Sequence, residues 1–101
     1  MGEARRDDAA RGAGVIPADA RVRKRSIAIG RHRTSVSLEA AFWDELAQIA
    51  ARRGQSLAAL VAEVDRARIA GRDLASAPNL SGALRLFVLG DLRERLAAPK
   101  A

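Results

Sequence analysis

The stretch Arg31-His32-Arg33-Thr34-Ser35-Val36-Ser37-Leu38 decides how the rest of this 101-residue chain can fold. From Arg33 onward, polar side chains alternate with β-branched or apolar ones. The polar positions are Arg33, Ser35 and Ser37, and the others are Thr34, Val36 and Leu38. Successive side chains of an extended strand point to opposite faces. The pattern therefore predicts a strand that buries one face and offers the other to water or to a partner.

The positive charge of the chain is concentrated around this strand. The net charge is +6, and residues 21–33 carry six Lys or Arg and no acid, whereas the rest of the chain has 12 basic and 12 acidic residues. The six cations are Arg21, Arg23, Lys24, Arg25, Arg31 and Arg33. A basic stripe on one element is typical of a polyanion binder, and the alternative is a solvated, solubilising tail.

The composition argues against several classes of protein. There is no cysteine, which removes disulfides and thiolate metal sites and favours a cytoplasmic setting. No apolar run is long enough to span a bilayer, and the N-terminus lacks the apolar core of a signal peptide. His32 is the only histidine, and on a strand it lies on the face opposite to Ser35, so the two cannot act as base and nucleophile. We expect no enzymatic activity, no metal and no cofactor.

Two segments precede the central strand. Residues 1–23 contain few large apolar side chains, so we expect a disordered basic tail. Ser26–Ile29 is either a second strand, with Gly30 turning the chain back, or the end of that tail. The sequence leaves both alternatives open.

The first helix is predicted to begin at Leu38 or Glu39, with Ser37 as its N-cap, and to end at residues 52–54. Its apolar positions recur at helical spacing, and together with those of the strand and of the next helix they form the expected dimer core. The core residues are Val36, Leu38, Phe42, Leu46, Ile49, Leu60, Val61 and Val64. Trp43 lies about 100° around the helix from Phe42, and we expect it at the edge of the buried stripe.

Two more helices complete the expected domain, which spans residues 24–96. Ser56 caps the second helix, and residues 70–79 form a linker. The third helix runs from Ser81 to about Leu96, and residues 97–101 form a C-terminal tail. Because the third helix is apolar around much of its circumference, it should have more than one neighbour.

A single strand and three short helices make a thin core and leave the backbone groups of the strand unpaired. Both problems disappear if two chains pair their strands antiparallel and interlock their helices. This accounting predicts an obligate homodimer.

The order strand, helix, Gly-x-Ser turn, helix resembles the ribbon-helix-helix repressors, the class of the Arc and methionine repressors. Within that class the chain is similar to a bacterial ribbon-helix-helix domain family without an assigned function. The matching blocks are Lys24-Arg25-Ser26-Ile27, residues 32–39, Phe42-Trp43, Gly54-Gln55-Ser56-Leu57, residues 60–63 and Asn79-Leu80-Ser81. The resemblance implies a mainly α, ribbon-helix-helix fold with an added C-terminal helix, as an obligate dimer forming an antiparallel β-ribbon.

The resemblance also implies a function and a set of contacts. A two-stranded ribbon enters the major groove of double-stranded DNA, where Arg33, Ser35 and Ser37 would contact bases. The expected phosphate contacts are Arg31, His32, Lys24, Arg25, Ser56 and Leu57. The expectation is a dimeric, sequence-specific DNA-binding protein, a transcriptional repressor associated with the nucleoid.

Two other functions remain open at this stage. The chain could be a protein-interaction module, an antitoxin or adaptor, that docks a partner on the third helix and Trp43. Alternatively, the basic tail could bind nucleic acid without regard to sequence. If Ser26–Ile29 pairs beside the ribbon, a dimer sheet of four strands would be too broad for the groove, and reading by the ribbon would be in doubt.

Overall fold

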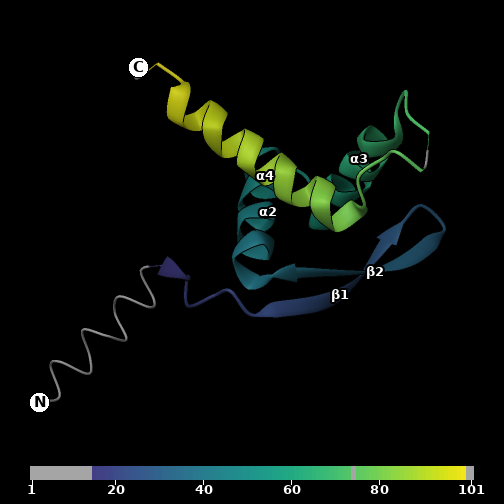
Figure 1. Cartoon of the computed structure of the whole chain (residues 1–101), viewed down its shortest axis with the longest axis horizontal. Coiled ribbons are helices and arrows are strands. Elements are labelled where there is room, and N and C mark those ends of the chain that lie inside the picture. Colours follow the sequence, from purple (N-terminus) through teal and green to yellow (C-terminus); the bar gives the residue numbers. More distant parts are fainter. Residues whose placement is uncertain (1–14, 74, 100–101) are drawn as a thin grey trace, which may run out of the picture.

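The computed structural model describes residues 15–73 and 75–99, and it shows a β-hairpin followed by three helices (Figure 1). The elements are β1 (Val22–Ile29), β2 (His32–Glu39), α2 (Ala40–Arg52), α3 (Leu57–Ile69) and α4 (Leu80–Ala97). The described helices lie on one side of the hairpin, and no described element covers its opposite side (Figure 1). None of the helices in the described ranges is long and apolar enough to cross a membrane.

The hairpin answers the question that the sequence left open at Ser26–Ile29. This segment is part of β1, which pairs antiparallel with β2, and Ile29 lies opposite His32 at the turn. Gly30 has a φ of 59°, and no described residue other than glycine has a positive φ, which is the pattern of a type II′ turn. β1 therefore does pair beside the strand expected to form the ribbon, and the two-stranded ribbon lies within one chain. Two chains joined at β2 would build the four-stranded sheet that is too broad for the groove.

The junction between β2 and α2 differs from our prediction. Ser37 is not the N-cap, because β2 continues to Glu39 and α2 begins at Ala40. The first amides of α2 find backbone partners instead: Ala40 donates to the carbonyl of Arg21 at 2.8 Å, and Ala41 donates to that of Asp19 at 3.0 Å. These acceptors come from a distant part of the sequence, and they leave the hydroxyl of Ser37 free of any capping role.

The same bonds bear on the tail predicted for residues 1–23. Residues 1–14 lie outside the described residues. The carbonyls at 19 and 21 are fixed to α2, and β1 begins at Val22, two residues before the expected start of the domain. The last part of the predicted tail is thus integrated into the fold.

The other predicted helix ends agree closely with the structure. Gly54 follows α2 with a φ of 66°, and the Oγ of Ser56 accepts a hydrogen bond from the amide of Ala59 at 3.1 Å. Asn79 caps α4 in the same way, accepting from the amide of Gly82 at 2.6 Å. The linker prediction is confirmed, and α4 extends one residue beyond each predicted end.

Seven of the eight predicted core residues are buried inside a single chain, and the exception is Phe42, which is only partly buried. Trp43 takes the central place that we had given to Phe42, with 2% of its surface exposed. The reason is β1. The guanidinium of Arg25 on β1 lies 5.2 Å from the centre of the Trp43 ring, and the Nε1 of Trp43 donates to the carbonyl of Arg23 at 2.9 Å. Phe42 lies instead beneath the guanidinium of Arg85, 5.8 Å from the ring centre.

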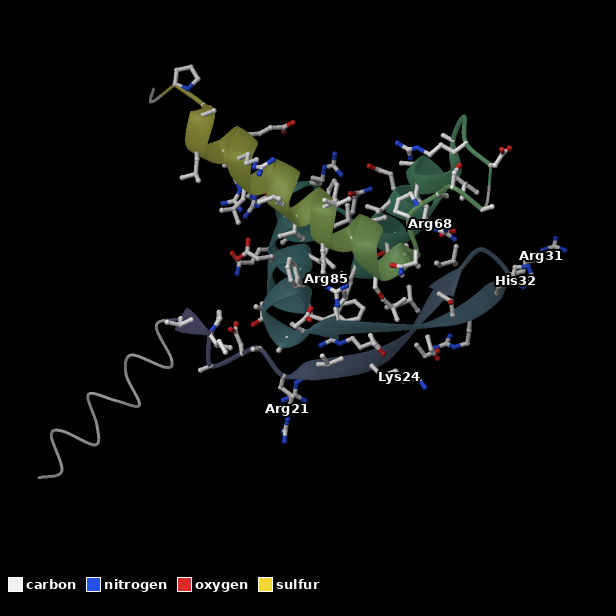
Figure 2. All side chains as sticks on the ribbon, in the orientation of Figure 1. Arg21, Lys24, Arg31, His32, Arg68 and Arg85 are labelled. Atoms are coloured by element: carbon white, nitrogen blue, oxygen red, sulfur yellow. The ribbon has the colours of Figure 1, made fainter. Side chains whose placement is uncertain are left out.

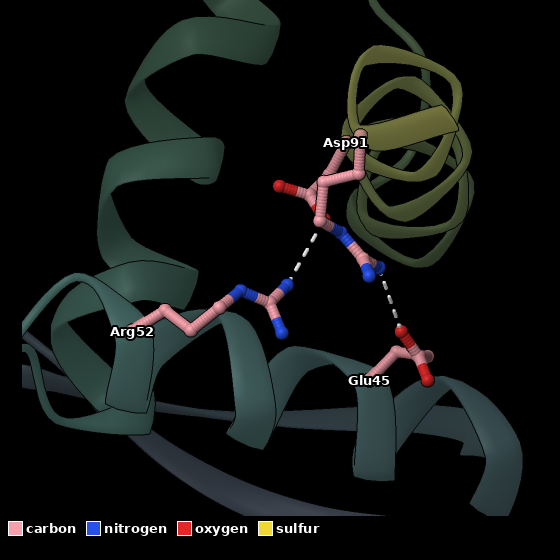
Figure 3. A network of polar contacts seen from close by, with 4 residues as sticks. Glu45, Arg52 and Asp91 are labelled. Atoms are coloured by element: carbon pink, nitrogen blue, oxygen red, sulfur yellow. Dashed lines mark hydrogen bonds and ion pairs between the residues drawn. The ribbon is translucent and has the colours of Figure 1, made fainter. Parts of the chain in front are cut away.

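Polar contacts fasten α4 to α2 and to β2. Asp91 accepts from Arg52 at 3.2 Å and from Arg95 at 2.8 Å, and Arg95 also reaches Glu45 at 3.3 Å (Figure 3). Beneath this network, Leu84 and Val88 enter the core. The helices and the inner face of the hairpin thus form one packed body.

Candidate nucleic-acid interface

The side of the hairpin turned away from the helices is the candidate interface, which we call the outer face. Register and alternation place four residues of each strand on it, and apart from the terminal pair Val22 and Glu39 the other six are all exposed. These six are Lys24, Ser26 and Ala28 on β1, and Arg33, Ser35 and Ser37 on β2. Ile27, Val36 and Leu38 lie on the inner face and are buried. The alternation predicted for β2 is confirmed.

Arginines have different surroundings in the two parts of the molecule. Of the eight arginines from residue 40 onward, five have a carboxylate within 3.3 Å: Arg52, Arg53, Arg68, Arg85 and Arg95. Among the described residues, none of the six cations at 21–33 has a carboxylate within 4 Å. Figure 2 shows Arg21 and Lys24 pointing away from the helices and Arg31 and His32 at the hairpin turn. The hairpin therefore presents positive charge that no described carboxylate neutralises.

Arg33 makes a hydrogen bond across the outer face. Its Nε donates to the Oγ of Ser26 on β1 at 3.2 Å, and both side chains are exposed. The residue directly opposite Arg33 is Ala28, whose methyl group leaves room for the arginine to lean across the hairpin. Because the bond uses Nε, both terminal nitrogens of the guanidinium stay available.

The residues predicted to contact phosphate are not all on one surface. Lys24 is on the outer face, and Arg31 and His32 are exposed at the turn. Arg25 lies on the inner face of β1, opposite Val36, and its guanidinium is 5.2 Å from the ring centre of Trp43. Its charge is therefore directed toward the helices.

Ser56 and Leu57 lie at the start of α3. The hydroxyl of Ser56 already accepts from the amide of Ala59, and Leu57 packs against the core. The amides of the first helical turn could still favour an anion.

The edge of β2 that does not face β1 is partly covered. In a two-residue hairpin the closing pair is hydrogen bonded and pairs alternate from there, so Arg33, Ser35 and Ser37 direct their backbone groups to this edge. The carbonyl of Ser37 already accepts a hydrogen bond from the hydroxyl of Ser81 on α4 at 3.1 Å. A strand from another chain could pair with this edge of β2 only up to Ser37, whose carbonyl is already bonded to Ser81.

Glu39 ends the hairpin with a negative charge that is already paired. Arg85 donates to both of its carboxylate oxygens, at 3.0 and 3.3 Å. The hydrogen bond from Arg85, helped by the backbone amide of Glu39, lowers the pKa of this carboxyl below its ordinary value of 4.5. Glu39 therefore does not expose an unpaired carboxylate to an approaching polyanion.

Sequence reasoning missed the contribution of β1 to this face. Ser26 and Ala28 follow Lys24 at spacings of two and four residues, and this parity was visible in the sequence. What the sequence did not provide was the register, which depends on a two-residue turn at Gly30-Arg31.

Comparison with known proteins agrees with this architecture. The sequence profile of the ribbon-helix-helix domain matches residues 22–92, most of the chain. The chain belongs to the ribbon-helix-helix domain family. Members of this family are typically DNA-binding regulators.

The fold of this ribbon-helix-helix chain is similar to that of one solved structure. It is an uncharacterized protein from Bordetella pertussis Tohama I, with 27% sequence identity and a TM-score of 0.64. The similarity covers 87% of this chain and 74% of that one. No curated protein matches the chain. The comparisons thus show the family and the fold of this chain.

Proposed function

We propose that this protein is a sequence-specific DNA-binding protein, acting as a transcriptional repressor, whose β1–β2 hairpin enters the major groove with its outer face toward the bases. The observation that carries the proposal is a two-stranded ribbon with polar and cationic side chains on its exposed face and no described carboxylate beside its cations. Strands lie about 4.8 Å apart and the major groove is about 12 Å wide, so a two-stranded ribbon fits.

Each side chain of the outer face has a contact suited to its chemistry. Arg33 can donate two hydrogen bonds to O6 and N7 of guanine, and Ser35 and Ser37 can donate to or accept from base edges. Ala28 presents a methyl group suited to the methyl of thymine. In this proposal Lys24, Arg31 and His32 contact phosphates, and all three side chains are exposed.

We further propose that the protein acts as a homodimer in which each hairpin reads its own half-site. Ribbon-helix-helix domains generally dimerise, which supports two copies. Two hairpins joined at their open β2 edges would form four strands about 14 Å across, wider than the groove of about 12 Å. Selected DNA sequences should therefore contain two separated half-sites, and sedimentation should give the mass of two chains.

Selection of bound duplexes from a random pool, followed by fluorescence anisotropy, tests the proposal. The Arg33→Ala variant should lose about 1–3 kcal/mol of discrimination at one base pair of each half-site. Arg93→Ala is the matched control, because Arg93 is exposed on α4 and has no carboxylate within 4 Å among the described residues. Full discrimination by the Arg33 variant would contradict base reading by the hairpin.

Binding by a basic tail alone is tested by truncation. The deletion should stop at residue 14, because the carbonyls of Asp19 and Arg21 cap α2 and β1 begins at Val22. We expect residues 15–101 to retain sequence preference. Loss of all preference in this truncated chain would support binding without sequence recognition instead.

A second candidate function is a protein-interaction module, an antitoxin or adaptor, and α4 favours it. Leu86, Leu89 and Leu96 are 62%, 42% and 80% exposed, and they recur along the side of α4 opposite the core. Leu86 also borders a groove of about 320 Å³ between α3 and α4. Trp43 no longer supports this candidate, since it is buried under β1. A stable partner that copurifies with the intact chain, lost on Leu86→Arg, together with no DNA binding, would favour this second function.

A further inference from the structure

We propose that Ser26 is a positioning residue that fixes the guanidinium of Arg33 for base reading, so that β1 sets the sequence specificity of β2. The inference rests on the proposed function, because it concerns how the same outer face recognises DNA. It adds a residue on the first strand to those expected from the sequence to read bases. The contact that carries it is the 3.2 Å hydrogen bond from Arg33 Nε to Ser26 Oγ.

The register of the hairpin explains why these two side chains meet. Ser26 lies opposite Ser35, and Arg33 lies opposite Ala28, so Ser26 and Arg33 are diagonal neighbours on one face. Such diagonal positions are about 7–8 Å apart, within reach of a long side chain. The small side chain of Ala28 leaves the path between them open. The hairpin thus offers Arg33 a single polar anchor on the neighbouring strand.

The nitrogen that is used determines what remains for DNA. The planar guanidinium of arginine can present its N–H groups in pairs. The O6 and N7 atoms of guanine each accept one hydrogen bond from such a pair. Because Nε donates to Ser26, the two terminal nitrogens, Nη1 and Nη2, form the pair that remains. Their hydrogens point outward from the tip of the side chain. An arginine without this anchor would have to lose the freedom of several torsions when it binds.

The hydroxyl of Ser26 can accept from Arg33 and still donate its own hydrogen. In water the bond adds little to the stability of the fold, because both groups are exposed and can bond to water instead. In the groove, water is displaced and the geometry of Arg33 decides which base is preferred. The role predicted for Ser26 therefore appears in discrimination between sequences rather than in folding stability.

The experiment compares Ser26→Ala, Ser26→Thr and wild type for binding to the selected duplex and to a duplex changed at the base pair assigned to Arg33. Ser26→Ala should reduce the ratio of the two affinities about three- to tenfold, the range expected for one hydrogen bond. Ser26→Thr keeps a hydroxyl acceptor and suits a strand, so it should keep most of the ratio. Thermal unfolding of all three proteins should be nearly equal.

A double-mutant cycle isolates the contact. In the Arg33→Lys background, which has no Nε, Ser26→Ala should leave the affinity ratio unchanged. In the free wild-type protein, the NMR signal of the Arg33 Nε hydrogen should exchange with water more slowly than in Ser26→Ala.

The possible results distinguish the positioning role of Ser26 from the proposed DNA recognition by the hairpin. If Arg33→Ala loses discrimination and Ser26→Ala keeps it, the positioning role is wrong and DNA reading by Arg33 stands. If Ser26→Ala weakens binding to both duplexes equally, Ser26 contacts the DNA backbone rather than positioning Arg33, and the inference is again overturned. If Arg33→Ala keeps full discrimination, base reading by the hairpin itself is contradicted.

Discussion

The hairpin and the helical layer use arginine in opposite ways. In the helical layer, Arg52, Arg85 and Arg95 are held by carboxylates from other elements, and they fasten α4 in place. On the hairpin, the cations stand close together and, among the described residues, none has a carboxylate partner within 4 Å. Like charges with no carboxylate nearby repel one another, and this repulsion opposes folding. This difference supports our proposal that the hairpin charge serves a polyanionic partner.

The largest expected effect on stability comes from removing the contact between the hairpin and the helical layer at Trp43. Trp43 is buried beneath β1 and donates to the carbonyl of Arg23, so Trp43→Ala should cost about 3–5 kcal/mol of unfolding free energy. The matched control is Phe42→Ala, which removes a partly buried ring from the adjacent position and should cost about 1–2 kcal/mol. Urea denaturation measures both. Equal losses would contradict the central place assigned to Trp43.

The two sets of cations should differ in their effect on DNA binding. With three or four phosphate contacts on each of two protomers, log K should fall with log salt at a slope of about −5 to −7. Replacing Lys24 by Ala should reduce the magnitude of this slope by about 1.8 per dimer, since one contact is lost on each protomer. Arg66→Ala removes the same charge from an exposed position of α3 and should leave the slope unchanged. A smaller slope in the Arg66 variant would show that the helical layer also contacts DNA.

Removing a carboxylate from the helical layer tests the other half of the comparison. Asp91 accepts from two arginines, and its side chain is 22% exposed, so Asp91→Asn should destabilise the fold by about 0.5–1 kcal/mol. Glu94→Gln changes a neighbouring exposed carboxylate and should be nearly neutral. DNA affinity should be the same in both variants. Weaker DNA binding by Asp91→Asn at unchanged stability would contradict a purely structural role.

The smallest effect concerns Glu39 and pH. Arg85 lowers the pKa of this carboxyl in the folded state, so its contribution to stability is present above the unfolded-state value and is lost as the pH falls through the folded-state value. The stability difference between wild type and Glu39→Gln should therefore be constant above about pH 5 and shrink below it. Thermal unfolding between pH 3 and pH 7 measures the difference, which should be independent of pH if the pair does not form.

Local signals in the sequence predicted much of the fold. The alternation from Arg33 fixed the two faces of β2, Gly54 ended α2, and Ser56 capped α3, because each depends on residues close by in the chain. The start of α2 was wrong, since its first amides bond to carbonyls about twenty residues away. Local sequence cannot reveal such partners.

The pairing of β1 was the decisive feature that local reasoning left open. Residues 23–25 are all charged, and the strand is exposed from Val22 to Ser26, so no apolar alternation marked this part as a strand. Once β1 pairs with β2, Trp43 rather than Phe42 faces the added surface, and Ser26 joins the outer face. The dimer remains a proposal, because the accounting that predicted it assumed one unpaired strand in each chain.

The most direct test of the central claim is an NMR titration of the backbone amides with the selected duplex at moderate salt. We expect the largest shifts at the outer face and the turn, in residues 24, 26, 28, 31–33, 35 and 37, with small changes along α4. Shifts concentrated on α3 and α4, with the hairpin unchanged, would contradict DNA recognition by the hairpin.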